Sequence, residues 1–123
     1  MTDVFIVTLG DRLLLAQLPR YEPLRDKLER AIVVSSEAVP ADVVTMNSRV
    51  RYVDGNGEHV AALVYPAAAG GPGALSIFSA SGAALLGLCE GQETECVLID
   101  GSLQRMRVDE VLHQPERAMR PGR

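Results

Sequence analysis

The stretch DVVTMNSRVRYV at residues 42–53 changes character halfway along, and it decides the fold. It begins as a linker after Pro40 and then alternates polar and apolar residues with a period of two over residues 46–53, which is typical of a half-buried strand. The polar residues Thr45 to Ser48 lie where the linker meets this strand. We expect their side chains to satisfy backbone groups at the junction. The stretch therefore predicts a boundary followed by the first strand of a sheet.

Downstream, the pattern predicts two hairpins and a short helix. The turn signal Asp54-Gly55-Asn56-Gly57 joins the first two strands, and Asp100-Gly101 marks a second turn. Between the hairpins, Ser81 is placed as the N-cap of an apolar helix that ends at Gly87 or Gly91. We expect antiparallel strands, with the helix on one face. Beyond the first, the predicted strands are residues 58–65, 74–79, 94–99 and 102–113.

Upstream, two short helices are predicted over residues 9–18 and 23–33, after a possible strand or extended segment at 3–7. In the second helix, apolar residues recur with helical spacing, and Asp26 and Arg30 are placed for an ion pair. The prolines of the Pro19-Arg20-Tyr21-Glu22-Pro23 segment separate the helices and give a helical hairpin. The element order predicts the α+β class rather than a βαβ nucleotide-binding plan.

The composition is that of a folded protein with one modest core. The chain has 123 residues, 47% of them hydrophobic and 4% aromatic. Its net charge of −4 is shared evenly between residues 1–44 and 45–123, so no segment has the dense positive charge that phosphate contacts need. We expect no direct nucleic-acid binding. The apolar runs are too short to span a membrane and no signal peptide is evident, which predicts a cytoplasmic protein.

The sequence offers no positive case for catalysis, a metal site or a cofactor. His59 and His113 are isolated, and we expect exposed or edge-strand positions for both. Glu93 and Glu95 would share one strand face, which suits a metal but is more typical of a solvated face. The cysteines, six residues apart, match neither a redox pair nor a zinc site, and we expect free thiols. The glycine spacing fits no phosphate-binding loop and no nucleophile elbow.

Four segments together are specific enough to indicate a family. DVVTMNSRV at 42–50, ALVYPA at 62–67, SGAALLGLCEGQ at 81–92 and QPE at 114–116 resemble the bacterial regulators of nucleoside diphosphate kinase, the Rnk family, which is related to the transcript-cleavage factors GreA and GreB. The resemblance covers nearly the whole chain, weakly over 1–23 and strongly over 40–116.

The resemblance implies a domain layout and a partner. It implies a short antiparallel coiled-coil hairpin in residues 1–40, an FKBP-like domain in 41–116 and a flexible tail in 117–123. It also implies docking on the rim of the secondary channel of RNA polymerase, in competition with Gre factors but without stimulating transcript cleavage. Control of nucleoside diphosphate kinase would then be indirect. We expect a monomer.

The resemblance also implies two partner-binding segments, neither of them catalytic. The first is the hairpin tip, with Arg20, Tyr21 and Glu22. Its one carboxylate is flanked by Arg20 and Arg25, a poor arrangement for holding magnesium. For Tyr21 and Glu22, a solvated loop is the alternative.

The second segment is the loop before the short helix, with Ser79, Ala80, Ser81 and Gly82. Relatives usually carry proline in place of Ala80, and Gly-Asp where this chain has Gly91-Gln92. Alanine leaves the loop less rigid, which puts the strength of polymerase binding in question. Ser81 and Gly82 have a second interpretation, as helix cap and turn alone.

Two further functions stay open from the sequence. The FKBP-like plan admits a peptidyl-prolyl isomerase, although that activity needs an aromatic-lined pocket and the chain has few aromatic residues. A protein-binding module unrelated to polymerase is the other alternative.

Overall fold

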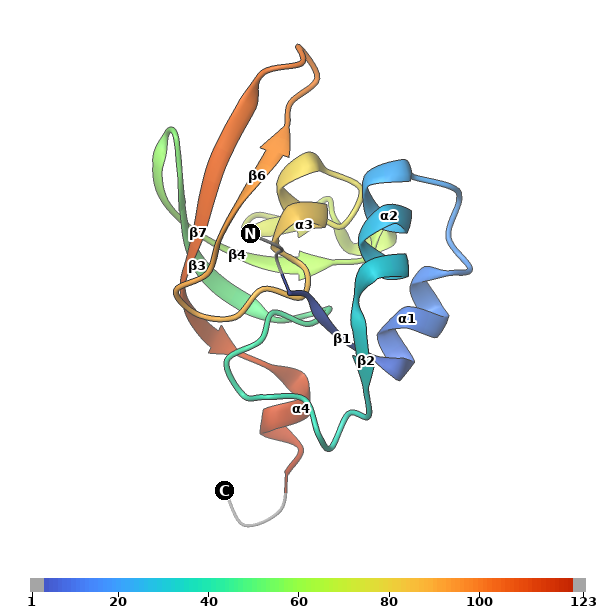
Figure 1. Ribbon diagram of the computed structural model, residues 1–123. Coiled ribbons are helices and arrows are strands. Elements are labelled where there is room, and N and C mark those ends of the chain that lie inside the picture. Colours follow the sequence, from blue (N-terminus) through green and yellow to red (C-terminus); the bar gives the residue numbers. More distant parts are fainter. Residues whose placement is uncertain (1–3, 121–123) are drawn as a thin grey trace.

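The computed structural model describes residues 4–120, which form a mixed α+β fold with a curled sheet and short helices (Figure 1). In chain order the elements are β1 (Ile6–Thr8), α1 (Leu9–Leu15), α2 (Glu22–Arg30), β2 (Ile32–Val34), β3 (Arg49–Asp54), β4 (Gly57–Val64), η1 (Pro66–Ala68), β5 (Ala74–Ser76), α3 (Ala80–Leu85), β6 (Glu93–Val97), β7 (Leu103–His113) and α4 (Pro115–Ala118).

The larger sheet has the strand order β5-β4-β3-β7-β6. Its pairs are antiparallel except for β4 and β5, which run parallel, with Ala62 opposite Ala74. The prediction of antiparallel strands is therefore wrong at this edge. The reason is that η1 and the loop after it carry the chain back along β4 before β5 begins, so β5 runs in the same direction.

The first strand of that sheet begins later than predicted. Residues 45–48 form a turn, closed by a 3.0 Å hydrogen bond from Ser48 N–H to the carbonyl of Thr45. Asn47 adopts a φ of 68°, which a regular strand excludes. The strand starts at Arg49, so Met46 enters the core from the turn rather than from a strand.

Both predicted helices are present but shorter at their C-terminal ends. The Thr8 hydroxyl caps α1 by accepting a hydrogen bond from Asp11 N–H at 3.1 Å, and Arg30 and Asp26 form the expected ion pair at 2.8 Å on α2. The second helix stops at Arg30 because the β-branched residues 32–34 pair with β1 in a small parallel sheet. Ile32, which the predicted helix of residues 23–33 includes, lies in β2 and is exposed.

The short helix α3 begins two residues before its predicted start. Ser79, not Ser81, is the N-cap: its hydroxyl accepts a hydrogen bond from Gly82 N–H at 3.0 Å. Gly87, with a φ of 85°, follows the helix, as predicted.

The C-terminal segment from Gln114 to Arg117 is hydrogen-bonded to residues 40–43. The amide of Gln114 is buried and donates to the carbonyls of Pro40 and Val43, each at 2.8 Å. It is followed by α4, and Arg117 donates to the Ala41 carbonyl at 3.2 Å. Flexibility of residues 117–123 stays a prediction, since 121–123 lie outside the described residues.

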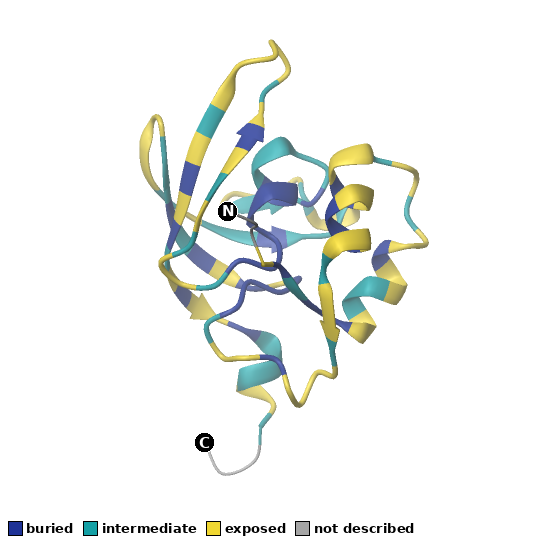
Figure 2. Cartoon of the chain, in the orientation of Figure 1, coloured by how far each residue is buried: buried dark blue, intermediate teal, exposed yellow. Residues whose placement is uncertain are grey.

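One core serves both the helices and the larger sheet (Figure 2). Leu15 of α1 and Leu28 of α2 belong to the same buried cluster as Leu85 of α3 and Met106 of β7. Burial of one such leucine contributes about 2 kcal/mol, so α2 is held on the domain by hydrophobic packing. The division at residues 40–41 stays a prediction.

Candidate partner-binding surface

The two predicted partner-binding segments lie next to each other. Tyr21, at the N-cap of α2, packs edge-on against Phe78, with ring centroids 5.6 Å apart and an interplanar angle of 69°. Phe78 directly precedes Ser79, the first residue of the predicted docking loop. The contact joins residues 20–22, the predicted tip, and residues 79–82 into one surface, which we call the tip–loop surface.

The tip carries an ion pair rather than a free acidic group. Arg20 donates to the carboxylate of Glu22, and both side chains are exposed. This hydrogen bond, with the charge of Arg20, lowers the pKa of Glu22. Within residues 4–120 there is no cluster of histidine, cysteine or acidic residues that could hold a metal.

Two residues of the loop have structural roles. Besides capping α3, the Ser79 hydroxyl donates to the Ser76 carbonyl at 2.7 Å. A Cβ atom added to Gly82 would lie 2.1 Å from that same carbonyl oxygen, so the close approach requires glycine. Ala80 and Ser81 are half-buried. Any contact made by loop side chains would therefore come from these two residues.

A buried lysine, which the sequence reading missed, fixes α2 against α3. The ammonium group of Lys27 donates to the carbonyls of Ala84 at 2.6 Å and Leu86 at 2.8 Å, at the C-terminal end of α3. It also lies over the Phe5 ring, 4.3 Å from the centroid. A cation suits this helix end, where carbonyls lack intrahelical partners. The available signal was its position between Leu24 and Leu28, on the apolar face of α2.

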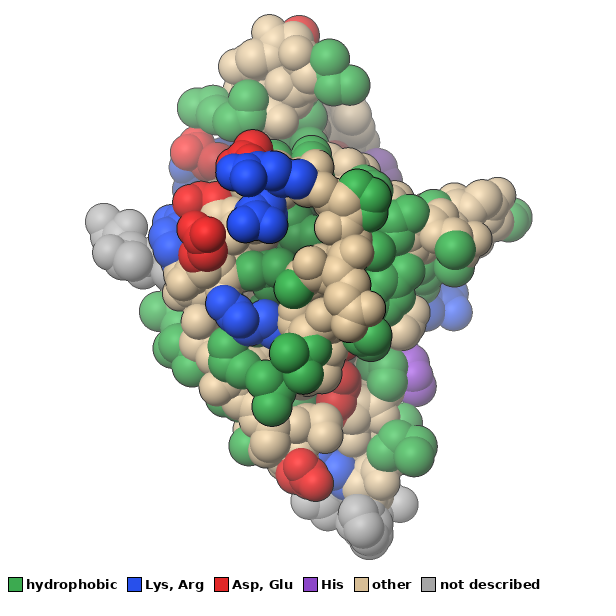
Figure 3. All heavy atoms as spheres, turned by 90° about the vertical axis from the view of Figure 1, so that its right-hand side faces the viewer, with side chains coloured by type: hydrophobic (Ala, Val, Ile, Leu, Met, Phe, Trp, Pro, Cys, Tyr) green, Lys and Arg blue, Asp and Glu red, His purple; other side chains and the backbone are tan. Residues whose placement is uncertain are grey.

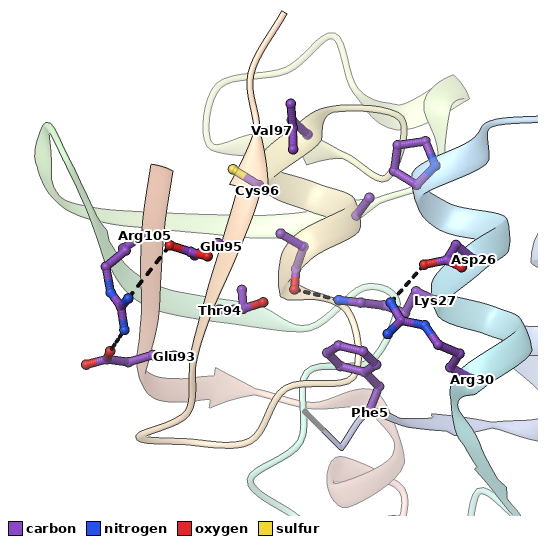
Figure 4. Close-up of a pocket in the computed structure, with 14 residues that line it drawn as sticks. Phe5, Asp26, Lys27, Arg30, Glu93, Thr94, Glu95, Cys96, Val97 and Arg105 are labelled. Atoms are coloured by element: carbon purple, nitrogen blue, oxygen red, sulfur yellow. Dashed lines mark hydrogen bonds and ion pairs between the residues drawn. The ribbon is translucent and has the colours of Figure 1, made fainter. Parts of the chain in front are cut away.

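A groove of about 800 Å³ lies beside the tip–loop surface (Figure 4). Its walls are α2 and β6, and α3 lies between them. In the groove wall Arg105 binds Glu93 at 2.8 Å and lies 3.7 Å from Glu95. The hydrogen bond from Arg105 lowers the pKa of Glu93. The two carboxylates considered as metal ligands are therefore bound by one guanidinium.

The face that carries α1 and α2 has mixed charge. Figure 3 shows small groups of basic side chains next to acidic ones, with apolar side chains between them. Leu9 and Leu13 of α1 are among its exposed apolar groups. Such a face differs from the continuous basic surface on which phosphate binding depends.

The polar stretch of residues 45–48 links α1, the sheet and α4. Met46 N–H donates to the carboxylate of Asp11 at 3.0 Å, and the Thr45 hydroxyl donates to Glu116 at 2.7 Å. Thr45 N–H donates to the Ser48 hydroxyl at 2.9 Å. The prediction that these polar side chains satisfy backbone groups is confirmed for Ser48.

Two groups in this polar cluster have shifted pKa values. Burial, with a smaller contribution from the Glu116 carboxyl, raises the pKa of Asp11 to about 6, although the hydrogen bond from Met46 favours the charged form. Burial, followed by the charges of Asp11 and Glu116, raises the pKa of Tyr65 to about 12. Tyr65 lies at the end of the β4 hairpin, so the cluster joins distant parts of the chain.

The remaining candidates for chemistry are separate from one another. His59 stacks on Tyr52 and lies 2.8 Å from Asp54, whereas His113 is exposed at the end of β7. The thiols of Cys89 and Cys96 are free, half-buried and buried respectively, as expected. Burial raises the pKa of Cys96, which keeps it in the thiol form.

Comparison with known proteins places the chain in a family. The chain is 42% identical over 106 residues to the regulator of nucleoside diphosphate kinase of Escherichia coli (strain K12), covering 84% of this chain and 78% of the relative. This chain belongs to the family of regulators of nucleoside diphosphate kinase. The family resemblance inferred from the sequence is thereby confirmed. No protein-family profile matches the chain.

Solved structures relate this Rnk-family chain to transcription factors. A prokaryotic transcription elongation factor GreA/GreB from Nitrosomonas europaea matches with a TM-score of 0.69 and 34% identity, over 91% of this chain and all of that one. The transcription factor Gfh1 matches with a TM-score of 0.50 and 26% identity, over 75% of this chain and 60% of that one. The Rnk-family chain therefore has a GreA/GreB-like fold. Within residues 4–120 no helix is long and apolar enough to cross a membrane.

Proposed function

We propose that this chain is a non-catalytic transcription regulator that binds RNA polymerase at the rim of the secondary channel. The Tyr21–Phe78 contact is the observation that carries the proposal, because it makes the tip and residues 79–82 one continuous surface. The GreA/GreB-like fold and the family membership support it. In this proposal residues 41–116 form the docking domain, and the helical hairpin of residues 1–40 enters the mouth of the channel. The chain binds polymerase as a monomer.

The proposal includes competition with Gre factors without transcript cleavage. Helices of seven and nine residues are only about 10 and 14 Å long, too short to reach deep into a channel. The carboxylate of Glu22 is held by Arg20, whereas positioning a catalytic magnesium ion requires acidic oxygens without a competing cation. The chain would occupy the Gre-factor site on the polymerase without accelerating transcript cleavage.

The test uses purified core polymerase from the source organism. Binding is measured with labelled chain, and a Gre factor is then added as competitor; cleavage is followed on stalled elongation complexes. We expect saturable binding, displacement by the Gre factor and no faster cleavage. Absence of binding at micromolar concentrations would rule out the proposal, and accelerated cleavage would rule out its non-catalytic part.

Nothing in the groove favours the isomerase alternative. Among the described residues that line it, Phe5 is the one aromatic side chain, and the Lys27 ammonium lies over its ring. A proline-isomerisation assay on a chromogenic peptide should show no rate enhancement. Control of nucleoside diphosphate kinase would run through transcription, so the purified kinase and this chain should not bind each other.

A further inference from the structure

The strand β6 forms an edge of the larger sheet, and its free side opens into the groove. Within residues 4–120 it pairs with β7 alone. Every residue of β6 lines the groove, together with residues of α2 and α3 (Figure 4). An open strand edge beside a groove is the setting in which a protein segment adds to a sheet.

The hydrogen bonds at the two ends of the β6–β7 ladder show which backbone groups are already used. At one end Leu98 N–H donates to the Ser102 carbonyl at 2.9 Å; at the other, Val108 N–H donates to the Gln92 carbonyl at 3.1 Å. Bonded pairs alternate along an antiparallel ladder. The residues of β6 bonded to β7 are therefore Thr94 and Cys96.

The alternate residues Glu93, Glu95 and Val97 direct their N–H and C=O groups away from β7, toward the groove. Their side chains are exposed on the outer face of the sheet. Among the described residues, no hydrogen-bond partner outside the β6–β7 pair is found for the backbone N–H and C=O groups of Glu93, Glu95 and Val97. Their spacing of two residues is the repeat that an added strand requires.

The acidic groups Asp26 and Glu93 that line the groove are each paired with an arginine, so an occupant needs little charge of its own. On α2, Asp26 is bound to Arg30 at 2.8 Å, and on the outer face of β6, Glu93 is bound to Arg105 at 2.8 Å. Between the walls lie alanine side chains of α3 and the Phe5 ring. The small apolar residues are Ala80, Ala83 and Ala84.

We propose that an extended segment of a partner protein binds in this groove as an additional strand on β6. Its main chain would bond Glu93, Glu95 and Val97, and its inward side chains would be small and apolar to fit over the alanines. The proposal stands apart from polymerase docking, because it rests on backbone groups of β6 rather than on the tip–loop surface.

The probe is a library of short random peptides displayed on phage, selected on the full chain. Enriched peptides are synthesised and titrated against Glu95→Pro, which removes a groove-facing N–H while leaving the ladder to β7 complete. Glu95→Ala is the matched control, since it removes the same carboxylate but keeps the N–H. Amide hydrogen exchange of β6 in the wild-type chain provides a readout that needs no variant.

We expect enriched peptides to slow exchange at Glu93, Glu95 and Val97, with little change at Thr94 and Cys96, which β7 already protects. Glu95→Ala should bind normally and Glu95→Pro about tenfold or more weakly. The proposal is overturned if no peptide is enriched, if Glu95→Pro binds equally well, or if protection appears elsewhere. Polymerase binding is measured in parallel, so that failure of this proposal and of polymerase docking are distinguished.

Discussion

The ammonium nitrogen of Lys27 on α2 lies 2.6 Å from the carbonyl oxygen of Ala84 on α3, and both residues are buried. This charge-assisted hydrogen bond, with a second one to Leu86, fixes α2 against α3. The tip–loop surface depends on it, because Tyr21 meets Phe78 only if α2 keeps this position.

Replacing Lys27 by methionine should destabilise the protein by about 2 kcal/mol, because the carbonyls of Ala84 and Leu86 lose a charged donor inside the core. Urea unfolding followed by circular dichroism measures the free energy. Arg25→Met is the control, since Arg25 is exposed on the same helix and its loss should change stability by less than about 0.5 kcal/mol. Equal effects of the two variants would contradict the role of Lys27.

Tyr21→Ala should separate the tip from the loop and cost about 1 kcal/mol in the aromatic contact with Phe78. Tyr21→Phe retains the ring and serves as the control for the hydroxyl. A double-mutant cycle with Phe78→Ala isolates the pair, and its coupling free energy should be close to that value. Full additivity of the two alanine substitutions would show that the rings do not interact.

Gly82→Ala should destabilise the protein by about 3 kcal/mol, since the new methyl group would lie 2.1 Å from the Ser76 carbonyl oxygen. Gly10→Ala is a matched control on α1: a Cβ there meets nothing within 4 Å, and helix propensity favours alanine by up to about 1 kcal/mol. Thermal unfolding of both variants should therefore shift in opposite directions. A tolerated Gly82→Ala would mean that α3 does not approach β5 this closely.

The raised pKa of Asp11 predicts that the stability of the protein depends on pH in a specific way. The pKa of Asp11 in the folded protein is about 6, above its ordinary value of 3.8, so the folded state holds the proton more tightly than the unfolded state. The stability from the protonated form is complete below pH 4 and is lost as the pH rises through about 6. A pKa shift of this size corresponds to a loss of about 3 kcal/mol.

Asp11→Asn tests this dependence, because the amide oxygen still accepts from Met46 N–H but carries no charge. Relative to wild type, the variant should gain stability between pH 4 and pH 7.5. The groups with lowered pKa values, such as Glu22 and Glu93, lose their contribution only as the pH falls, so they act in the opposite direction. A stability difference that is constant over this range would contradict the burial of the carboxylate.

Local sequence patterns predicted most helices and strands, but they did not predict the tertiary contacts or the direction of β5. Periodicity and turn residues predicted the helices, the hairpins and their order. Both Ser79 and Ser81 are good N-caps, and the choice depends on how closely Gly82 approaches Ser76, a contact that only the folded chain defines. The parallel direction of β5 likewise depends on the path of η1 rather than on the residues of the strand.

The candidate site, too, could be predicted only in part from the sequence. Its segments, the tip and residues 79–82, could be predicted from the family resemblance. Their junction through Tyr21 and Phe78 could not, because those residues are distant in the sequence. Lys27 was missed because a lysine on an apolar helix face is normally solvated, and its carbonyl partners come from a different helix.

Competition for core RNA polymerase is the most direct measurement of the central claim. A labelled Gre factor bound to polymerase is titrated with the wild-type chain and with Tyr21→Ala, Tyr21→Phe and a double variant, Ala80→Arg with Ser81→Glu, that alters both half-buried loop side chains. Wild type and Tyr21→Phe should displace the Gre factor, whereas Tyr21→Ala and the loop variant should require at least about tenfold higher concentrations. Equal displacement by all four proteins, or none by the wild type, would contradict docking through the tip–loop surface.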